Sequence, residues 1–259
     1  MTPLLDVQNL SIDFKLNHQV IPIIKDISFS LNKGETLGIV GESGSGKTVT
    51  VQSILRLIPQ PPLHHISGKV LFKQQDLLQM PKSDLRQIRG QRIAYIFQEP
   101  MTALNPVLTI GEQIREMLHE HRTIKGAELK DKVIDLLYEV GIPSPEIRIN
   151  SYPHELSGGM RQRAMIAMAL SCDPEILLAD EPTTALDVTI QAQVLDLFQQ
   201  IASERGMAII FVTHDLSVIA EIANQVLVMK SGELMDYGDI FKVFDHPTSA
   251  YTKQLLAFI

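Results

Sequence analysis

A glycine-rich loop between Gly41 and Thr48 constrains the fold of this chain more than any other stretch. It reads Gly-Glu-Ser-Gly-Ser-Gly-Lys-Thr, which is the G-x-x-x-x-G-K-[ST] pattern of a phosphate-binding P-loop. An apolar run precedes it, and apolar residues at helical spacing follow it. A strand before and a helix after distinguish a P-loop from a Gly/Ser turn that ends in Lys-Thr by chance. The sequence therefore predicts a nucleotide-binding α/β domain.

Each residue type in this loop has a physical role beside a phosphate. Gly41, Gly44 and Gly46 allow positive φ and a close approach of the backbone. The loop N–H groups form an anion nest, and the helix that starts near Gly46 adds its dipole. Lys47 can reach the β- and γ-phosphates, and the Thr48 hydroxyl can ligate Mg²⁺. The expected nucleotide-binding residues are Gly41, Glu42, Ser43, Gly44, Ser45, Gly46, Lys47, Thr48 and Thr50.

Composition excludes several classes of protein. The 259 residues allow one large domain or two modest ones. No apolar run approaches the ~18–20 residues of a membrane span, and the N-terminus lacks the pattern of a signal peptide, so we expect a soluble cytoplasmic protein. A net charge of −7 argues against nucleic-acid binding. The single cysteine, Cys172, excludes an internal disulfide and is expected to be a small packed residue.

The pattern along the chain predicts an α/β fold with a mostly parallel sheet, an N-terminal antiparallel β part and an inserted helical part. Alternation in the first forty residues predicts short antiparallel strands with one exposed face. From 100 to 170 the apolar spacing is helical, whereas the unbroken run Ile176–Ala179 predicts a central parallel strand. We also expect a helix after the P-loop that carries Thr50, Val51, Ile54, Leu55 and Ile58 and stops at Pro59. Further strands are expected at 68–72, 93–97 and 207–212. A helix is expected through 190–201, a hairpin turn at 230–232, and short helices from Asp239 on.

Two further stretches carry chemistry. The apolar strand at 176–179 ends in Asp180 and Glu181, a Walker B arrangement in which Asp180 positions Mg²⁺ and Glu181 polarises the attacking water. The alternative is a solvated acidic turn. His214 follows an apolar strand, at the sheet edge where ligands bind in open α/β folds. It could contact the γ-phosphate and hold the water-polarising carboxylate.

The stretch Leu156-Ser157-Gly158-Gly159-Met160-Arg161-Gln162 closely resembles the signature motif of ABC-transporter ATPases. The resemblance covers essentially the whole chain and implies the ABC ATPase fold, with ATP as the nucleotide. It also implies Gln98 as the Q-loop glutamine, 184–187 with Asp187 as the D-loop, His214 as the switch histidine and Phe14 as the aromatic that stacks on adenine. Phe14 could instead be a core aromatic of the first hairpin. The residues implied to bind the partner's ATP are Leu156, Ser157, Gly158, Gly159, Met160 and Gln162.

Other stretches resemble the dipeptide, oligopeptide and nickel importer branch of that family. They are 98–106, 152–155, 187–193 and 246–252. Many peptide-importing members continue with a cysteine-bearing extension, whereas this chain stops at Ile259; a short member and a truncated sequence remain the alternatives. The resemblance implies one ATPase domain over 1–259, with a nucleotide-binding core at 1–98 and 172–259 and a helical subdomain at 99–171.

The resemblance implies an ATP-hydrolysing subunit of an importer for peptides or a related small solute. Its expected catalytic residues are Glu181, His214, Lys47 and Gln98, and its Mg²⁺ ligands are Thr48, Gln98 and Asp180. Expected partners are a second ATPase subunit, related or identical, two permease subunits, and indirectly a solute-binding protein. The subunit would sit on the cytoplasmic face of the inner membrane. Alternatives are an exporter or lipoprotein-release ATPase, a non-transport ABC ATPase, and a non-enzymatic nucleotide-binding scaffold.

Overall fold

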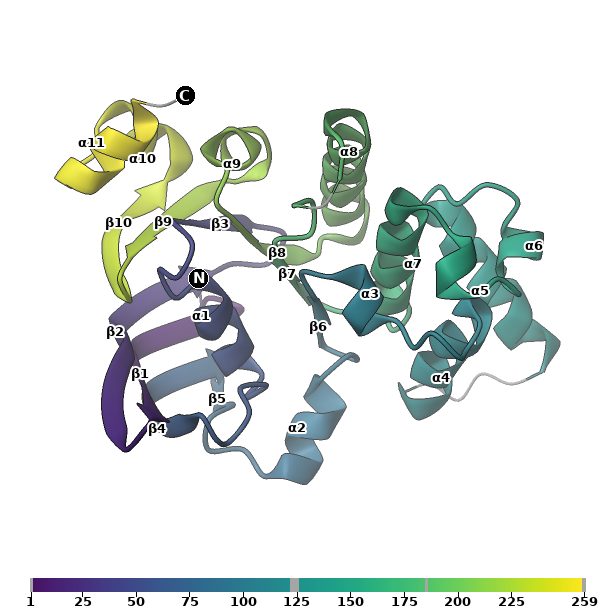
Figure 1. The fold of residues 1–259 in the computed structure, drawn as a ribbon, viewed down its shortest axis with the longest axis horizontal. Helices are drawn as coiled ribbons and strands as arrows, with labels where there is room; N and C mark the ends of the chain where they lie inside the picture. Colours follow the sequence, from purple (N-terminus) through teal and green to yellow (C-terminus); the bar gives the residue numbers. More distant parts are fainter. Residues whose placement is uncertain (1, 122–125, 185, 258–259) are drawn as a thin grey trace.

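A computed structural model describes residues 2–121, 126–184 and 186–257 of the chain. Two sheets and a group of helices make up the molecule (Figure 1). The first sheet is antiparallel with the strand order β2-β1-β4-β5. Its strands are β1 (Leu5–Leu16), β2 (Gln19–Leu31), β4 (Leu63–Phe72) and β5 (Gln75–Asp76). The predicted antiparallel part is therefore present, but β1 and β2 are long strands of 12 and 13 residues rather than short ones. Asn17 and His18, both with positive φ, turn the chain between them.

The second sheet is mostly parallel and has the strand order β10-β9-β3-β8-β7-β6. Its strands are β3 (Thr36–Val40), β6 (Ile93–Ile96), β7 (Ile176–Asp180), β8 (Ala208–Thr213), β9 (Gln225–Lys230) and β10 (Glu233–Asp239). The strand β7 lies between two parallel neighbours, β6 and β8, so the central parallel strand expected at 176–179 is confirmed. The strands β9 and β10 form the antiparallel hairpin expected at 230–232.

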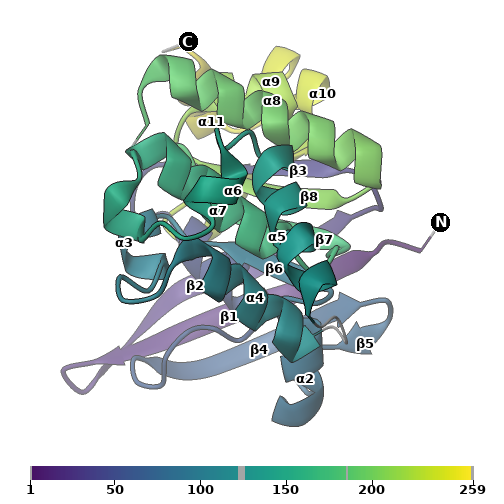
Figure 2. The same cartoon turned by 90° about the vertical axis from the view of Figure 1, so that its right-hand side faces the viewer.

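Helices cover both faces of the second sheet, and one group of them extends beyond its β6 edge (Figures 1 and 2). That group lies in the stretch where helical spacing begins at residue 100. No helix in the described part of the chain is long and apolar enough to cross a bilayer. The helices are α1 (Lys47–Ile54), α2 (Lys82–Ile88), α3 (Pro100–Ala103), α4 (Ile110–His121), α5 (Ala127–Glu139), α6 (Pro145–Arg148), η1 (Pro153–Glu155), α7 (Gly158–Leu170), α8 (Val188–Arg205), α9 (Leu216–Ile222), α10 (Ile240–Asp245) and α11 (Ala250–Leu256).

The parallel sheet separates two hydrophobic cores because alternate residues of its strands point to opposite faces. In β7, Leu177 and Ala179 pack in the core under the helices. Ile176 and Leu178 pack in the other core, against the antiparallel sheet and α1. Burial on both faces explains why this strand has no polar alternation. The same burial holds its carboxyl end, and hence the acidic pair that follows, in a fixed place.

The helix after the P-loop is shorter than the sequence predicts. We expected apolar residues as far as Ile58 to be helical and Pro59 to stop the helix, but α1 ends at Ile54. Arg56 has a φ of +52°, which is incompatible with a continued right-handed helix. The Arg89 guanidinium donates to the carbonyls of Leu55 and Arg56 at 2.6 and 2.9 Å. The guanidinium of a residue from a distant segment therefore binds the carbonyl oxygens that follow the end of α1.

Asp236 on β10 joins the C-terminal helices to the sheet. Only 5% of the residue is exposed, and its carboxylate accepts from the N–H groups of Thr248 and Ser249 at 3.1 and 3.0 Å and from the Thr248 hydroxyl. Burial would raise the pKa of Asp236, but hydrogen bonds, with that from Thr248 the strongest, lower it to about 2.

We expect Asp236→Asn to lower the melting temperature by about 3 to 6 °C at pH 7, since a charge-assisted network is lost. The folded-state pKa lies below the unfolded value of about 3.9. The stabilisation is therefore fully present above that unfolded pKa and is lost as the pH falls through about 2. Thermal melts at pH 7, 4 and 2.5 should show the difference between wild type and variant shrinking with acidification. A constant difference over that range would contradict the assignment.

Candidate functional site

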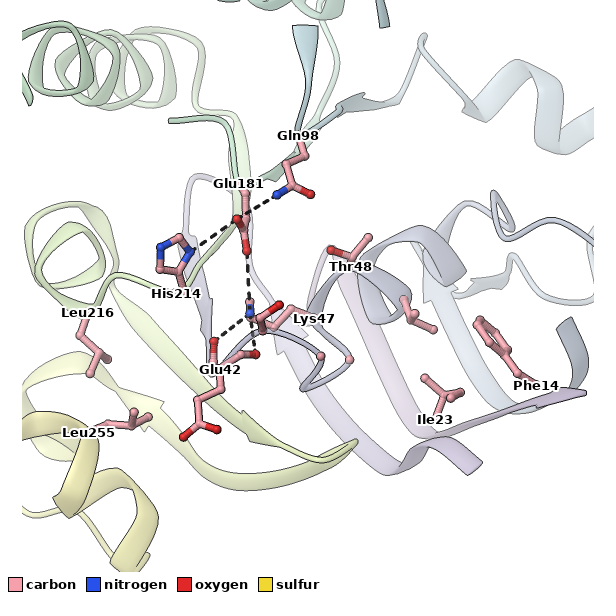
Figure 3. Close-up of a pocket in the computed structure, with 15 residues that line it drawn as sticks. Phe14, Ile23, Glu42, Lys47, Thr48, Gln98, Glu181, His214, Leu216 and Leu255 are labelled. Atoms are coloured by element: carbon pink, nitrogen blue, oxygen red, sulfur yellow. Dashed lines mark hydrogen bonds and ion pairs between the residues drawn. The ribbon is translucent and has the colours of Figure 1, made fainter. Parts of the chain in front are cut away.

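The residues with predicted chemistry meet at the carboxyl ends of four parallel strands. The P-loop follows β3, Gln98 comes shortly after β6, Glu181 follows β7, and His214 follows β8. Strand β3 pairs with β8, β8 with β7, and β7 with β6, so these ends share one edge of the sheet. They border a cavity of about 730 Å³, seen in Figure 3. Its lining residues are Phe14, Ile23, Gly41, Glu42, Ser43, Gly44, Gly46, Lys47, Thr48, Val49, Gln98, Glu181, His214, Leu216 and Leu255.

The P-loop is folded tightly on the neighbouring strand β9. Gly41 has a φ of +155°, and a Cβ at this position would lie 2.2 Å from the carbonyl oxygen of Met229, so no other residue fits there. Gly46 precedes the first residue of α1, Lys47. Gly44, Gly46 and Lys47, which lead into α1, line the cavity, so the N-terminus of this helix borders it, an arrangement suited to an anion.

Lys47 is the buried cation of the site, with 4% exposure. Its ammonium donates to the carbonyl oxygens of Gly41 at 2.8 Å and Glu42 at 3.1 Å. Burial lowers the pKa of Lys47, and the charges of Glu181 and Asp180 oppose that shift. The ammonium lies 3.9 Å from the Glu181 carboxylate. A buried ammonium at the mouth of the loop is placed to neutralise a phosphate.

Glu181 lies at the centre of the polar network in Figure 3. Its Oε2 accepts from Gln98 Nε2 at 3.1 Å and from the Thr184 hydroxyl at 2.9 Å, and His214 Nδ1 lies 3.5 Å away. The backbone of Glu181 has a φ of +46°, an uncommon conformation for a residue with a Cβ. The turn redirects the chain from the buried strand so that this carboxylate enters the cavity.

Asp180 is held by hydrogen bonds from two directions. Thr48 donates its hydroxyl to Oδ1 at 3.0 Å, and Tyr95 on β6 donates its own to Oδ2 at 2.7 Å. Burial raises the pKa of Asp180, and the hydrogen bonds from Tyr95 and Thr48 oppose that shift. Sequence reasoning missed Tyr95, because it has no motif of its own; the only signal was its place on the strand that leads to Gln98.

The oxygen pair formed by Thr48 and Asp180 fits a magnesium ion. Hydroxyl and carboxylate oxygens are hard ligands, and Mg²⁺ in nucleotide sites uses one or two carboxylates together with phosphate oxygens and water. Within the described residues, no group of three or more His, Cys, Asp or Glu side chains could hold a metal alone. Thr48 and Asp180 supply only part of a ligand set, so they suit a Mg²⁺ that binds together with the phosphates of a nucleotide.

Tyr95→Phe tests whether this hydroxyl orients Asp180. One hydrogen bond to a charged group is lost, which is worth about 1.5 kcal/mol or roughly tenfold. We expect the Mg²⁺ concentration for half-maximal ATP hydrolysis to rise about three- to tenfold, while ATP affinity measured in EDTA stays unchanged. Magnesium titrations of turnover, together with calorimetric ATP binding in EDTA, check both statements. An unchanged magnesium requirement would remove Tyr95 from the role.

The apolar part of the cavity includes Phe14 on β1 and Ile23 on β2, which lie near each other on one side of the P-loop (Figure 3). Phe14 also packs against the core between the sheets, as the alternative of a core aromatic expects, and its stacking on adenine stays a prediction. Its half-buried ring is available to a base. Sequence reasoning missed four apolar lining residues: Ile23, Val49, Leu216 and Leu255. Three of them belong to elements that meet the P-loop only in the fold, whereas Val49 directly follows Thr48 in the chain.

Some of the expected nucleotide-binding side chains face away from the cavity. Thr50 is fully buried and donates its hydroxyl to the Gly46 carbonyl at 3.0 Å. Ser45 is also buried and does not line the cavity. In the signature stretch, Leu156 and Gln162 are 4% and 1% exposed. The side chains of Thr50, Leu156 and Gln162 therefore pack within the fold of this chain, and their part in binding ATP stays a prediction.

The signature motif lies at the N-terminus of α7, away from the cavity of its own chain. Ser157 caps this helix, its hydroxyl accepting from the Met160 N–H at 3.3 Å, and both Ser157 and Gly158 are exposed. A Cβ on Gly159 would lie 2.8 Å from Ile190 on α8, so a side chain here would push the two helices apart. None of the residues 156–162 lines the cavity.

Asp187 of the predicted D-loop caps α8, because its carboxylate accepts from the Ile190 N–H at 3.0 Å. Ala185 of the same motif lies outside the described residues. The signature and the D-loop thus start neighbouring helices that touch through Gly159 and Ile190. Cys172 is buried, as expected of a small packed residue.

Comparison with known proteins identifies the family. The family model described as "ABC transporter" matches residues 24–184. The chain belongs to the ABC transporter family. This membership confirms the expected ATPase type, and the ABC ATPase fold is confirmed by a solved structure of this family. That structure is a dimeric ATP-binding cassette in a post-hydrolysis state bound to ADP and Pi, with a TM-score of 0.81 and 27% identity over 91% of this chain and 98% of that one.

Curated relatives within the family are more similar in sequence. The oligopeptide transport ATP-binding protein OppD of Bacillus subtilis is 49% identical over 99% of this chain and 72% of its own length. The peptidoglycan transport ATP-binding protein YejF of Agrobacterium fabrum is 50% identical over 98% of this chain. The chain spans only 47% of the length of that second relative.

Proposed function

We propose that this chain is the ATP-binding and ATP-hydrolysing subunit of an ABC importer that takes up peptides. The observation that carries the ATPase part is the convergence of Lys47, Thr48 and Glu181 on one cavity at the sheet edge, with the Asp180 carboxylate bound to the Thr48 hydroxyl. The groups of this chain that would bind the phosphates and orient a water lie at that edge. A non-enzymatic scaffold would not need Glu181 and His214 to be 3.5 Å apart.

Each residue has a distinct part in the proposed hydrolysis. Backbone N–H groups of the P-loop and the Lys47 ammonium bind the phosphates of ATP and withdraw charge from them. Glu181 accepts a hydrogen bond from the attacking water and orients it in line with the γ-phosphate. Gln98, Thr184 and His214 hold that carboxylate in place. Thr48, Asp180 and Gln98 would hold a Mg²⁺, which would supply charge neutralisation on the phosphates.

The signature motif supports a two-subunit site. Ser157 and Gly158 are exposed at a helix N-terminus but do not line the chain's own cavity. A helix N-terminus is suited to a phosphate, so we propose that it closes the ATP site of a second ATPase subunit, related or identical. Loss of the γ-phosphate would remove atoms that both subunits bind, which would open the dimer.

The proposed solute class is peptides. Its support is the 49% identity to an oligopeptide transport ATP-binding protein and the importer-like stretches at 98–106 and 246–252. Solute contacts would lie in the permeases and the binding protein. The reconstitution test described below therefore distinguishes dipeptides, oligopeptides and nickel chelates as solutes. An exporter or lipoprotein-release ATPase is the alternative function.

A groove beside the Q-loop is the proposed docking place for a permease. It has a volume of about 570 Å³, and exposed apolar side chains, Phe97, Met101 and Val107, occur in the same part of the chain. The groove would lie between the proposed nucleotide-binding core, 1–98 and 172–259, and the proposed helical subdomain, 99–171. Its lining residues include Arg86, Arg89, Ala103, Asn105, Glu116 and Met168. A permease bound here would hold the subunit on the cytoplasmic face of the inner membrane.

The test is purification of the assembled complex followed by reconstitution in lipid. We expect two permease chains and a second ATPase subunit to co-purify with this chain, and ATP hydrolysis to rise when a binding protein loaded with its solute is added. A panel of dipeptides, oligopeptides and nickel chelates identifies the solute. Stimulation by a solute on the ATPase side would favour an exporter instead, and basal hydrolysis without any permease partner would favour a non-transport ATPase.

A further inference from the structure

The C-terminal helix α11 contacts the P-loop directly. Tyr251, with 7% exposure, places its hydroxyl 3.3 Å from the N–H of Glu42 and accepts a hydrogen bond from it. One turn further on, Leu255 lines the cavity beside Leu216 (Figure 3). The chain segment from 225 to 257 lies outside the part that matches the family model, residues 24–184. A helix beyond the matched region thus forms one wall of the nucleotide cavity.

Tyr251 is held in place by groups that do not belong to the P-loop. The Lys230 ammonium lies over its ring, 4.4 Å from the centroid, at a distance that is favourable for a cation–π contact. Ser249 caps the helix by accepting from the Thr252 N–H at 3.0 Å. Asp236 binds the Thr248–Ser249 segment that leads into it. The hydroxyl therefore presents a fixed acceptor to the loop.

The hairpin before α11 touches the other end of the loop. The Gly232 N–H donates to the Ser45 carbonyl oxygen at 2.9 Å, and Gly41 packs on Met229 with no room for a Cβ. The C-terminal segment therefore contacts the P-loop at its first residues and again at Ser45. These contacts restrain the loop between two points of the same segment.

A single peptide plane connects Tyr251 to Lys47. The N–H of Glu42 and the C=O of Gly41 belong to the same peptide group, whose atoms lie close to a plane. The Tyr251 hydroxyl binds the N–H, and the Lys47 ammonium binds the C=O at 2.8 Å. Any rotation of this plane that released Tyr251 would also displace the oxygen that holds Lys47.

We propose that Tyr251 is a positioning residue for ATP binding, which acts through the Gly41–Glu42 peptide on Lys47 and so makes nucleotide affinity depend on the C-terminal segment. This inference rests on the proposed function, because it takes ATP to be the ligand of the loop. It assigns a role to Tyr251, which the sequence marked only as part of the importer-like stretch 246–252.

The experiment compares Tyr251→Phe with the matched control Tyr237→Phe in the full chain. Tyr237 also has a hydrogen-bonded hydroxyl, paired with the backbone of Ser30 at 3.1 Å, but it does not line the cavity. We expect Tyr251→Phe to weaken ATP binding in calorimetry about three- to tenfold, the effect of one hydrogen bond, and to raise KM by a similar factor. The value of kcat at saturating ATP should stay within about twofold, because Glu181 is untouched.

Hydrogen exchange gives a readout that does not depend on hydrolysis. The Glu42 amide should exchange faster in Tyr251→Phe than in wild type and at the wild-type rate in Tyr237→Phe. If Tyr251→Phe does not fold, Lys230→Gln, which removes only the cation over the ring, should weaken ATP binding about twofold. Unchanged ATP affinity in the variant that folds, or an equal effect of Tyr237→Phe, would overturn the positioning role alone. A wild-type chain that binds no ATP would overturn the proposed function as well.

Discussion

Glu181→Gln is expected to bind ATP as wild type does and to hydrolyse it about 10²- to 10³-fold more slowly. The amide has the size of the carboxylate, so the packing around β7 should persist. It carries no charge, however, and cannot polarise the attacking water. Oε2 of the wild-type residue accepts from Gln98 and Thr184 at 3.1 and 2.9 Å, and an amide oxygen in the same place can still accept both bonds. The loss should therefore fall on kcat, with little change in ATP affinity.

The measurement is steady-state phosphate release alongside calorimetric ATP binding. Glu221→Gln is the matched control, because Glu221 is exposed on α9 and does not line the cavity; its turnover should equal that of wild type. Hydrolysis by Glu181→Gln at more than about a tenth of the wild-type rate would remove Glu181 from the water-polarising role. A large loss of ATP affinity would instead indicate that the carboxylate supports the loop through its 3.9 Å contact with Lys47.

Lys47→Ala is expected to weaken ATP binding itself, by about 10- to 100-fold, the effect of losing charged hydrogen bonds worth about 1.5 to 3 kcal/mol. The ammonium is buried, and its charge is the one cation among the lining residues of the cavity, His214 aside. Without it, the negative charges of Asp180 and Glu181 would face the phosphates uncompensated. Binding should therefore fall in the presence and in the absence of Mg²⁺.

Calorimetric titration with ATP checks this, with Lys69→Ala as the control. Lys69 is exposed on β4 of the antiparallel sheet, so its removal changes the net charge by the same amount at a distance from the cavity. Equal affinities of Lys47→Ala and wild type would contradict the assignment of the P-loop. Equal losses in both variants would indicate a general effect of net charge.

Sequence patterns were sufficient for the chemistry that is local in the chain. The P-loop, the acidic pair after 176–179 and His214 are each recognisable because a short run of residues contains both the functional group and the strand that positions it. Since parallel strands in such folds end at the same edge, the meeting of Lys47, Glu181 and His214 followed from strand periodicity. These elements lie where the sequence predicts them.

Helix boundaries and inward-facing side chains were less predictable. The helix α1 ends at Ile54 because Arg89, more than thirty residues away, binds the carbonyls of Leu55 and Arg56. Gln162 lies within the signature stretch yet is buried, because its helix packs against α3, α4, α5 and β6. No local sequence pattern contains these distant partners. Helix ends and buried side chains that depend on tertiary packing could therefore not be predicted from local propensity.

By itself the sequence determined the nucleotide loop, its acidic and histidine partners, the ABC family and the alternation of strands and helices, since each depends on residues close together in the chain. Only the tertiary structure decided that Tyr95 holds Asp180, that Leu255 lines the cavity, and that Tyr251 binds the P-loop. Tyr95 and Asp180 are 85 positions apart in the sequence, and Tyr251 and Glu42 are 209 positions apart. The physical reason is that hydrogen bonds and apolar contacts act over a few ångströms of space, whatever the distance along the chain.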